Sequence, residues 1–536
     1  MIIWKKLKLD IIKYIFQTII LSLLMISEAF ILEIIIKVAK SKSYDTFFLI
    51  TLIVIVFIVS QAIVYFYQQF LTQKLSNKAI ALYRKDIFEK LSERPLEQLS
   101  TDSKGMFLAS LTNQTDLISQ NYFYVIFWGG YLFCQFILSV IVAFYVNPTI
   151  AIAALLLSLP NLLIAIFFKK KLEKRQKILI DAVNDYTSDV KDLIDGIIEW
   201  KIYSNNESIK KVFSCSTHNL FLKQVFVERF QYFVISLNHF FSNLLFFGSW
   251  LVGIYFIIVG QLNLASMVGF SQLLIRISFP VYSSSDLITQ YISGKKILLS
   301  INEMLNISPN TFLEADMIET IEDIEIKNYS FISSDNREIE PLNFTIHKNE
   351  KYLLKGASGI GKTTFLRSLF KEYTSYNGEL LLNGKNIKNI DENSIFKQIG
   401  YVSQNPHIFS ASLRENLTLF SNHYTEQELF EVLHFVELGK WANSASLSNF
   451  LGDKGLKISG GEVKRVALAR VLLANKPILF LDELTSGLDR QTANKLETAL
   501  LKLDKTIIYI SHTVDRDVEM QFNHLITFKT KDILSL

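Results

Sequence analysis

The stretch that decides the fold is Gly356-Ala-Ser-Gly-Ile-Gly361-Lys362-Thr363. It follows a short apolar run, Tyr352 to Leu354, and precedes a stretch typical of a helix, Thr364 to Phe370. Two glycines and a Lys-Thr pair at this spacing, between a strand and a helix, are the pattern of a phosphate-binding loop. The glycines let backbone N–H groups turn toward phosphate oxygens, and the start of the helix adds a favourable dipole. The sequence therefore predicts a nucleotide site in an α/β domain.

The side chains of this loop have distinct predicted roles. Lys362 can reach the β- and γ-phosphates of ATP, and the Thr363 hydroxyl can ligate Mg²⁺. The residues of this segment expected to hold the nucleotide are Gly356, Ser358, Gly359, Gly361, Lys362, Thr363 and Thr364.

A second motif, Ile478-Leu479-Phe480-Leu481-Asp482-Glu483, is an apolar run that ends in two acids. Such a run predicts a buried strand that delivers carboxylates to its C-terminal edge, where ligands bind in open α/β sheets. Asp482 is expected to hold Mg²⁺ through water, and Glu483 to polarise the attacking water as general base. Together with the phosphate loop, this motif predicts an ATPase site.

The chain divides into a part suited to lipid and a part suited to water. It has 536 residues, a net charge of +4 and 50% hydrophobic residues. That charge is too small to favour a nucleic-acid partner. Two distant cysteines, Cys134 and Cys215, form neither a disulfide framework nor a metal ligand set. A membrane-spanning helix needs about 20 mostly apolar residues. Six segments qualify: 11–38, 46–67, 122–146, 148–168, 232–258 and 263–288.

The connections between these segments predict their orientation. Residues 68–121 and 169–231 are long, helix-friendly and rich in Lys and Arg, whereas Asn147-Pro148 and 260–263 are short, uncharged turns. The positive-inside rule places the two long connections in the cytoplasm. The first outer loop, with Lys37, Lys40 and Lys42, opposes the rule but is outweighed. The C-terminal domain is therefore expected in the cytoplasm, on a multi-pass protein of a bacterial cytoplasmic membrane.

Several polar residues lie in or near the apolar segments. A charge at the bilayer centre costs about 2.5–3.5 kcal/mol on insertion scales, so it usually faces protein or a water-filled cavity. Two interpretations remain open, namely pairs that hold helices together and a polar lining for a substrate chamber. The residues concerned are Glu28, Glu33, His239, Arg276 and Asp286.

Between the two ATPase motifs lies Ile458-Ser459-Gly460-Gly461-Glu462, followed by a basic, alanine-rich stretch, residues 463–470. This segment closely resembles the signature sequence of ATP-binding cassette (ABC) proteins, usually Leu-Ser-Gly-Gly-Gln before such a helix. A Ser hydroxyl, two glycine amides and a helix N-terminus can form an anion site. Ser459, Gly460 and Gly461 are therefore expected to contact ATP.

The other motifs of that family follow in order. Gln404, in Tyr401-Val402-Ser403-Gln404, matches the glutamine loop that senses Mg²⁺ and touches the membrane domain. Residues 485–489, which end in Asp489, resemble the loop that crosses the dimer interface. His512 follows an apolar run, Thr506 to Ile510, and matches the switch histidine that contacts the γ-phosphate. The resemblance thus implies Glu483, His512 and Gln404 as catalytic residues, and Thr363, Gln404 and Asp482 around Mg²⁺.

The resemblance extends to the exporters of this family. Gly452-Asp453-Lys454-Gly455 looks like the short exporter loop that contacts the opposite membrane domain, and Gly105 and Asp195–Lys201 resemble segments near coupling helices. The implied plan is a six-helix membrane domain with long cytoplasmic extensions (1–305), a linker that includes Ser308-Pro309-Asn310 (306–322), and an α/β ATPase domain of ABC type (323–536).

Three positions depart from the family pattern. An aromatic residue usually stacks on adenine near the start of the ATPase domain, but Ser333 stands there, with Phe331 and Tyr329 as the possible substitutes. The signature begins with Ile458 in place of Leu. It ends with Glu462 in place of Gln, which adds a negative charge near the phosphate site.

The resemblance implies a half-transporter that works as a dimer, because one chain carries one phosphate loop and one signature. A homodimer is the simpler expectation, and a heterodimer with a related chain stays open. The expected function is ATP-driven export of a hydrophobic or amphipathic peptide, lipid or drug-like compound. The alternatives are uptake of a metal-chelate-type ligand through the same fold and an ATP-gated channel or sensor. Six apolar segments exclude a soluble ATPase.

Overall fold

The structure, a computed structural model, describes residues 2–41, 44–101, 104–203, 206–305, 316–332, 339–452, 455, 457–511 and 514–530. The chain forms two compact units: Met1–Glu93 with Lys104–Asn306, and Arg94–Ser103 with Ile307–Leu536. Six of the features singled out above lie outside the described residues: Lys42, His512, Ser333, Asp453, Lys454 and the linker segment Ser308-Pro309-Asn310.

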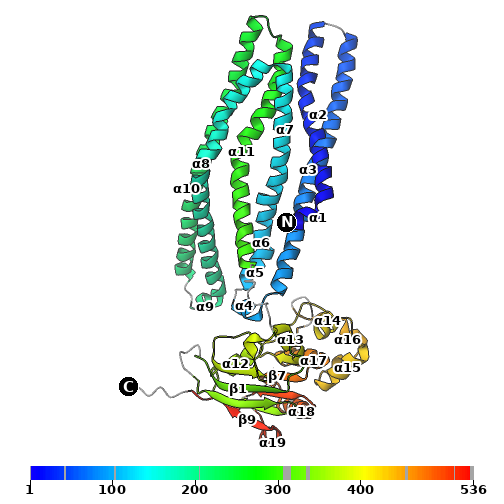
Figure 1. Ribbon diagram of the computed structural model, residues 1–536, viewed down its shortest axis with the longest axis vertical. Helices are drawn as coiled ribbons and strands as arrows, with labels where there is room; N and C mark the ends of the chain where they lie inside the picture. Colours follow the sequence, from blue (N-terminus) through cyan, green and yellow to red (C-terminus); the bar gives the residue numbers. More distant parts are fainter. Residues whose placement is uncertain are drawn as a thin grey trace, which may run out of the picture. The chain divides into compact units, whose positions relative to one another are not determined.

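The first unit is a bundle of long helices, several of which run side by side in Figure 1. Within the described ranges, six helices are long and apolar enough to cross a membrane, which confirms the six predicted spans. The long helices are α2 (Lys8–Ser41), α3 (Tyr44–Ser92), α7 (Val125–Val146), α8 (Pro148–Asp195), α10 (Asn206–Ile258) and α11 (Leu264–Leu305). The short elements are α1 (Ile2–Lys6), α5 (Lys104–Leu111), α6 (Asn113–Ile118), the π-helix η1 (Ser119–Tyr124) and α9 (Ile197–Ile202).

Both predicted short turns separate long helices. The Asn147 side chain caps α8 by accepting from the backbone N–H groups of Thr149 and Ile150, each at 3.1 Å, and Pro148 follows at the first helical position. Proline suits that position because it has no N–H to satisfy. Gly260 has a φ of +79° in the turn after α10, a conformation that favours glycine.

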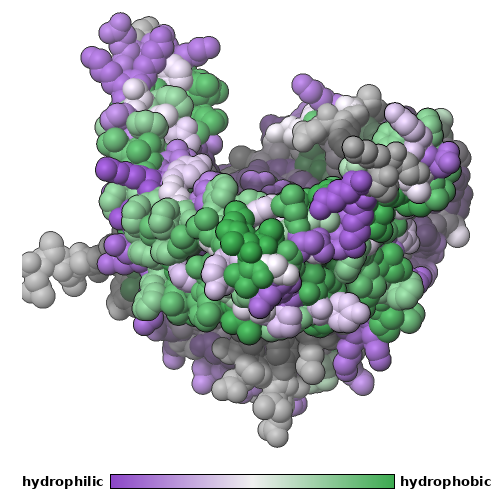
Figure 2. Space-filling view, turned by 90° about the horizontal axis from the view of Figure 1, so that it is seen from above, coloured by the Kyte–Doolittle hydropathy of each residue, from purple (hydrophilic) through white to green (hydrophobic). Residues whose placement is uncertain are grey.

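The surface of the helical unit is apolar where a soluble protein would be polar. None of the residues in the most apolar window of α3 is buried within the chain. Hydrophobic side chains cover much of the face seen from above in Figure 2. Because large exposed apolar patches mark interaction with other proteins or lipid, this surface fits a membrane-embedded domain.

The second unit contains two sheets. A parallel sheet has the order β6-β7-β8-β3-β9, and an antiparallel sheet has the order β2-β1-β4-β5. The parallel strands are β3 (Lys351–Lys355), β6 (Ile399–Val402), β7 (Ile478–Asp482), β8 (Thr506–Ile510) and β9 (His524–Thr527). The antiparallel strands are β1 (Asp323–Ser330), β2 (Leu342–His347), β4 (Asn377–Leu382) and β5 (Lys385–Asn386).

Helices surround these sheets. Those that position the site are α4 (Leu96–Thr101), α12 (Lys362–Ser368), α13 (Glu392–Gln398), α14 (Leu413–Thr418), α17 (Gly460–Leu473) and α18 (Arg490–Leu501). The others are α15 (Glu426–Phe435), α16 (Ser444–Leu447), α19 (Arg516–Glu519) and the 3₁₀ turns η3 (Ile387–Asn389) and η4 (Gly439–Trp441).

Alternation along the strands divides the core between the two faces of the parallel sheet. On β7, Ile478 and Phe480 join one buried cluster, whereas Leu479 and Leu481 join another. Successive side chains of a strand point to opposite faces, so a sheet covered on both sides has continuous apolar strands. The ends of these strands are therefore fixed firmly in place.

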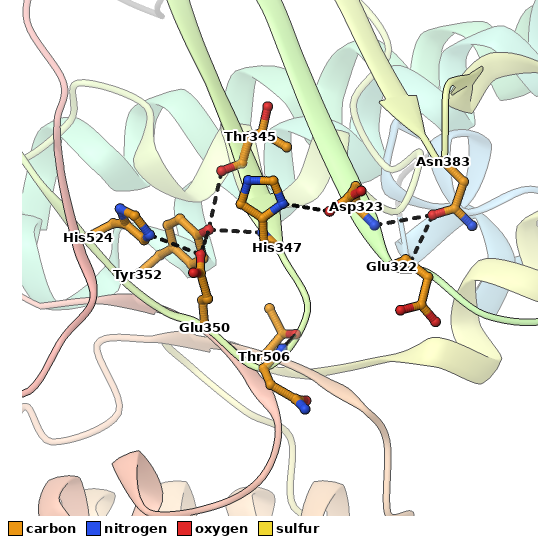
Figure 3. Close-up of polar contacts among 10 residues, drawn as sticks. Glu322, Asp323, Thr345, His347, Glu350, Tyr352, Asn383, Thr506 and His524 are labelled. Carbon is orange, nitrogen blue, oxygen red and sulfur yellow. Dashed lines mark hydrogen bonds and ion pairs between the residues drawn. The ribbon is translucent and has the colours of Figure 1, made fainter.

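A network of polar contacts lies at the amino-terminal edge of the parallel sheet (Figure 3). The Tyr352 hydroxyl donates to Glu350 at 2.6 Å, His524 contacts the same carboxylate at 2.9 Å, and His347 contacts Asp323 at 2.7 Å. The Tyr352 and His524 rings also stack with centroids 4.7 Å apart. These two histidines therefore join β1, β2, β3 and β9 at the edge opposite the predicted phosphate site.

Candidate functional site

The phosphate loop lies between β3 and α12, as predicted. Three of its glycines have positive φ angles, with +148° at Gly356, +78° at Gly359 and +105° at Gly361. A side chain at Gly361 is excluded for two reasons: the positive φ, and a Cβ that would lie 1.9 Å from the Phe331 ring. These angles require glycine and shape the loop that carries Ser358, which is exposed.

Lys362 is buried under this loop. Its Nζ donates to the carbonyls of Gly356 and Ala357, each at 2.9 Å. Burial lowers the pKa of the Lys362 ammonium, while Glu483 and Asp482 counteract the shift. The next residue, Thr363, donates its hydroxyl to Asp482 Oδ2 at 2.8 Å, and this bond joins α12 to the end of β7.

Asp482 has an oxygen suited to a cation. Its residue is 1% exposed, and burial raises the pKa of its carboxyl despite the Thr363 hydrogen bond. Oδ1 has no hydrogen-bond partner among the described residues. A buried carboxylate oxygen without a partner is costly, and a hard cation beside a hydroxyl would offset that cost. Asp482 and Thr363 thus fit Mg²⁺.

Glu483 and Gln404 meet in space although 79 residues separate them. Gln404 Nε2 donates to Glu483 Oε2 at 2.8 Å, from an exposed position just after β6. Since β6 and β7 are parallel neighbours, their carboxyl ends bring these side chains together. The structure therefore groups Lys362, Thr363, Asp482, Glu483 and Gln404 at one edge of the sheet.

The signature segment forms the start of α17. Ser459 caps the helix, and its N–H and hydroxyl donate to Glu462 at 2.9 and 3.0 Å in a capping box. Lys440 lies 2.5 Å from the other Glu462 oxygen. Burial disfavours the charge of Glu462, but Lys440 and Ser459 outweigh it and lower the pKa of the carboxyl. The extra negative charge expected here is thus largely balanced within the chain.

Asp489 caps a helix in this structure. Its carboxylate accepts from the Thr492 N–H at 2.9 Å at the start of α18, and this bond lowers its pKa. Within the described part of the chain, no hydrogen bond joins Asp489 or Ser459–Gly461 to the phosphate loop. These predicted nucleotide contacts therefore do not belong to the group around Lys362.

The two aromatic substitutes for adenine stacking are buried. Tyr329 is 0% and Phe331 3% exposed; Tyr329 bonds Ser368 at 2.8 Å, and Phe331 packs against the Tyr373 ring. Both rings therefore belong to the buried core beneath the phosphate loop, and neither presents a face for adenine in this structure. Ile332 follows them in the chain and is a large apolar side chain that is 61% exposed.

The first long connection between the membrane-length helices contributes helix α4 to this unit. The Leu96 N–H donates to Glu392 at 2.9 Å, Thr374 donates to Glu97, and Ser100 donates to the Glu372 carbonyl at 3.4 Å. Burial raises the pKa of Glu392, although the Leu96 N–H counteracts this. Helix α4 is therefore seated on the ATPase fold by polar contacts. The sequence did not predict these contacts of α4. It also did not single out Lys464, a lysine on the buried face of α17.

The polar residues of the helical unit are paired. Arg276 on α11 lies 2.5 Å from Glu28 on α2, and Gln61 on α3 donates to the same carboxylate. Glu33 accepts from Ser266 at 2.9 Å and pairs with Lys37 at 2.7 Å. The remaining two contact residues one turn away on their own helices, His239 with Asn243 and Asp286 with Gln290. The first two sets join different helices by polar contacts, and the His239 ring also packs edge-on against Tyr282 on α11, with centroids 6.1 Å apart.

Comparison with known proteins finds matches along most of the chain. Residues 11–281 match the family described as ABC transporter transmembrane region, and residues 339–486 match the family described as ABC transporter. The structure is similar to that of a bacterial Atm1-family ABC exporter with ATP bound, with a TM-score of 0.80 over 98% of this chain and 94% of that one. At 17% identity, this likeness shows the fold.

Two curated relatives are similar to this chain over most of its length. The transport/processing ATP-binding protein ComA of Streptococcus pneumoniae is 27% identical over 86% of this chain, and the match spans 65% of ComA's own length. The uncharacterized ABC transporter ATP-binding protein YwjA of Bacillus subtilis is 25% identical over 80% of this chain and 76% of its own.

Proposed function

Because the chain belongs to the ATP-binding cassette transporter family, we propose that it is a half-transporter that exports a hydrophobic or amphipathic substrate by ATP hydrolysis. The proposed organisation is a membrane domain of residues 1–305, a linker of 306–322 and an ATPase domain of 323–536. The proposed location is the cytoplasmic membrane of a bacterium, with the ATPase domain inside the cell. The substrate is a peptide, a lipid or a drug-like compound.

The observation that carries this proposal is the group Lys362, Thr363, Asp482, Glu483 and Gln404, together with the six membrane-length helices among the described residues. In the proposed mechanism Lys362 exchanges loop carbonyls for β- and γ-phosphate oxygens. Thr363 and Asp482 would hold Mg²⁺, which would neutralise phosphate charge when bound. Glu483 polarises the attacking water and Gln404 orients it, while the family resemblance assigns the γ-phosphate contact to His512.

A dimer is proposed because the Ser459-Gly460-Gly461 anion site and the phosphate loop are separate on one chain. A twofold partner brings the signature of each chain onto the ATP of the other, and twofold dimers are the commonest homo-oligomers. Exposed apolar side chains around α9 support a partner for the second cytoplasmic connection as well. They are Ile194, Ile197, Ile198, Ile202 and Tyr203.

ATP would drive transport through its different affinities for two states. It contacts both chains only when the ATPase domains are closed, so binding shifts the population toward closure. Helix α4 continues from α3 through a short connection and is seated on the ATPase fold at Glu392. Closure therefore acts on the membrane helices through α4, and hydrolysis resets them.

Inside-out membrane vesicles test the direction of transport. Vesicles with the wild-type chain should accumulate a lipophilic dye or a fluorescent phospholipid analogue when Mg²⁺-ATP is added, and Glu483→Gln vesicles should not. ATP-dependent depletion of the probe would favour uptake instead. Equal, downhill flux in both preparations would favour an ATP-gated channel, and either result would refute export.

A further inference from the structure

A buried lysine of α17 contacts the loop that carries Glu483. Lys464 is 8% exposed and lies one turn after Ser459–Gly461. Its Nζ donates to the Glu483 carbonyl at 2.7 Å and to the Ser486 hydroxyl at 2.5 Å, with a longer contact of 3.4 Å to the Ser486 carbonyl. A buried ammonium is costly unless acceptors match its N–H groups. Here all three acceptors belong to one loop.

This contact reaches the Glu483 backbone directly. Its φ is +49°, a left-handed conformation that a residue with a Cβ keeps only where its surroundings enforce it. The Glu483 N–H donates to the Ile510 carbonyl at 2.9 Å, at the end of β8, and its carbonyl accepts from Lys464. The same carbonyl also accepts from the Ser486 N–H at 3.3 Å within the loop. Strand β8 thus holds one polar group of the Glu483 backbone, and Lys464 holds the other together with this turn.

The same loop packs directly on the start of α17. A Cβ at Gly461 would lie 2.5 Å from Leu488 Cδ2, so a side chain at this position would displace that leucine. On the far side, the buried Thr485 hydroxyl donates to Glu497 at 2.8 Å and holds the loop to α18. Lys464 is therefore the charged link between α17 and a loop that is otherwise held by β8 and α18.

We propose that Lys464 is a positioning residue that couples the anion site at the start of α17 to the carboxylate of Glu483. This inference rests on the proposed function, in which Ser459–Gly461 serves the ATP bound by the partner and Glu483 serves the ATP bound by its own chain. A shift of α17 when the partner's ATP docks moves the Glu483 carbonyl through Lys464. Occupancy of one site thereby orients the general base of the other.

A merely structural role is the alternative, and the chain offers a matched control for it. Lys351 is 7% exposed, and its Nζ donates to the carbonyls of Asn349 and Leu503 at 2.9 Å and of Lys505 at 2.5 Å. Burial lowers the pKa of both ammonium groups. Lys351 therefore repeats the chemistry of Lys464, but at the amino-terminal edge of the parallel sheet, away from Glu483.

Steady-state ATPase kinetics of the full chain in lipid nanodiscs separate the two roles. Lys464→Met should lower kcat about tenfold or more, because a small misplacement of a catalytic group is costly, while KM for ATP stays within about twofold. Lys464→Arg should restore part of kcat. Lys351→Met should lower the Tm to a similar extent and keep kcat within about twofold of wild type. Ser486 is exposed, so Ser486→Ala folds in any case, and it should lower kcat about threefold.

Two further readouts address coupling. The Hill coefficient for ATP should fall toward one in Lys464→Met. Adding Lys464→Met to Glu483→Gln should not slow turnover further, because residues that act as a unit are not additive.

Three outcomes would overturn the inference in an active protein: kcat unchanged in both Lys464→Met and Ser486→Ala, an equal kcat loss in Lys351→Met, or multiplicative effects with Glu483→Gln. A folded wild type without turnover would instead refute the proposed function, and this inference with it.

Discussion

The Asp482 carboxyl lies where its charge is both costly and useful. Burial raises its pKa, and one oxygen has no protein partner among the described residues. Because the pKa is higher in the folded than in the unfolded chain, the group favours folding at acid pH and loses this contribution as pH rises through the raised pKa. Ionised Asp482 therefore destabilises the cation-free protein at neutral pH, and Mg²⁺ would reverse that penalty.

Asp482→Asn should raise the Tm of the full chain in EDTA at neutral pH. It should also lower Mg²⁺-ATPase activity about 100-fold or more. The Tm gap should close as pH falls, since wild-type Asp482 is then protonated. Thermal unfolding across pH, with and without Mg²⁺-ATP, measures both effects. A variant that melts below wild type in EDTA would show that the ionised Asp482 carboxylate does not destabilise the folded chain.

Residue pairs differ in how far sequence predicts them. Thr363 and Asp482 could be placed together because Thr363 starts the helix after one strand of the parallel sheet and Asp482 ends another strand of it. Their bond, and that of Gln404 with Glu483, agrees with this placement. The Lys440–Glu462 pair depends on tertiary packing, and no local pattern predicts it. Lys464 had a local signal, since it shares a helical face with Gly461 and Leu468 three and four residues away.

At the scale of elements, α4 is the informative case. Composition assigns residues 94–103 to the connection between membrane helices, but they cluster with the ATPase unit. The reason is three polar contacts with residues 372–392, together with Leu96 packed on the core of that unit. Hydropathy detects the length of a helix and not the surface on which it is seated.

Glu392→Ala should uncouple hydrolysis from transport. It removes the acceptor of the Leu96 N–H at the first residue of α13, so closure of the ATPase domains would move α4 less. Basal ATPase activity should remain within about twofold, while probe transport per ATP should fall about fivefold or more. Parallel vesicle transport and ATPase assays measure the ratio. A proportional loss of both activities would show that Glu392 supports only the fold.

At the scale of the whole molecule, the six spans follow from hydropathy, whereas the pairing of their polar residues does not. Glu28, Gln61 and Arg276 come from three helices and meet at one point. The side chains of Glu28 and Arg276 are 22% and 25% exposed. Removing one partner of a sequestered pair leaves an uncompensated charge, which is more damaging than removing both. This contact supports the interpretation in which charged pairs hold helices together.

Exchange of the two charges tests that interpretation. Glu28→Arg and Arg276→Glu should each lower the yield of monodisperse protein and vesicle transport, because two like charges then meet. The double variant should recover about half or more of both, as expected for contacting residues. Size-exclusion profiles and probe transport measure the recovery. Recovery of yield without transport would instead place the pair in the substrate path.

The most direct test of the central claim is complementation between two inactive chains. Lys362→Ala disables the phosphate loop, and Ser459→Phe disables the signature. Each homodimer then has two defective sites, whereas a mixed dimer purified through two different tags has one intact site. The account predicts that the mixed dimer regains a substantial part of wild-type Mg²⁺-ATPase activity while both homodimers stay inactive. A mixed dimer no more active than its parents, beside an active wild type, would contradict ATP sites shared between chains.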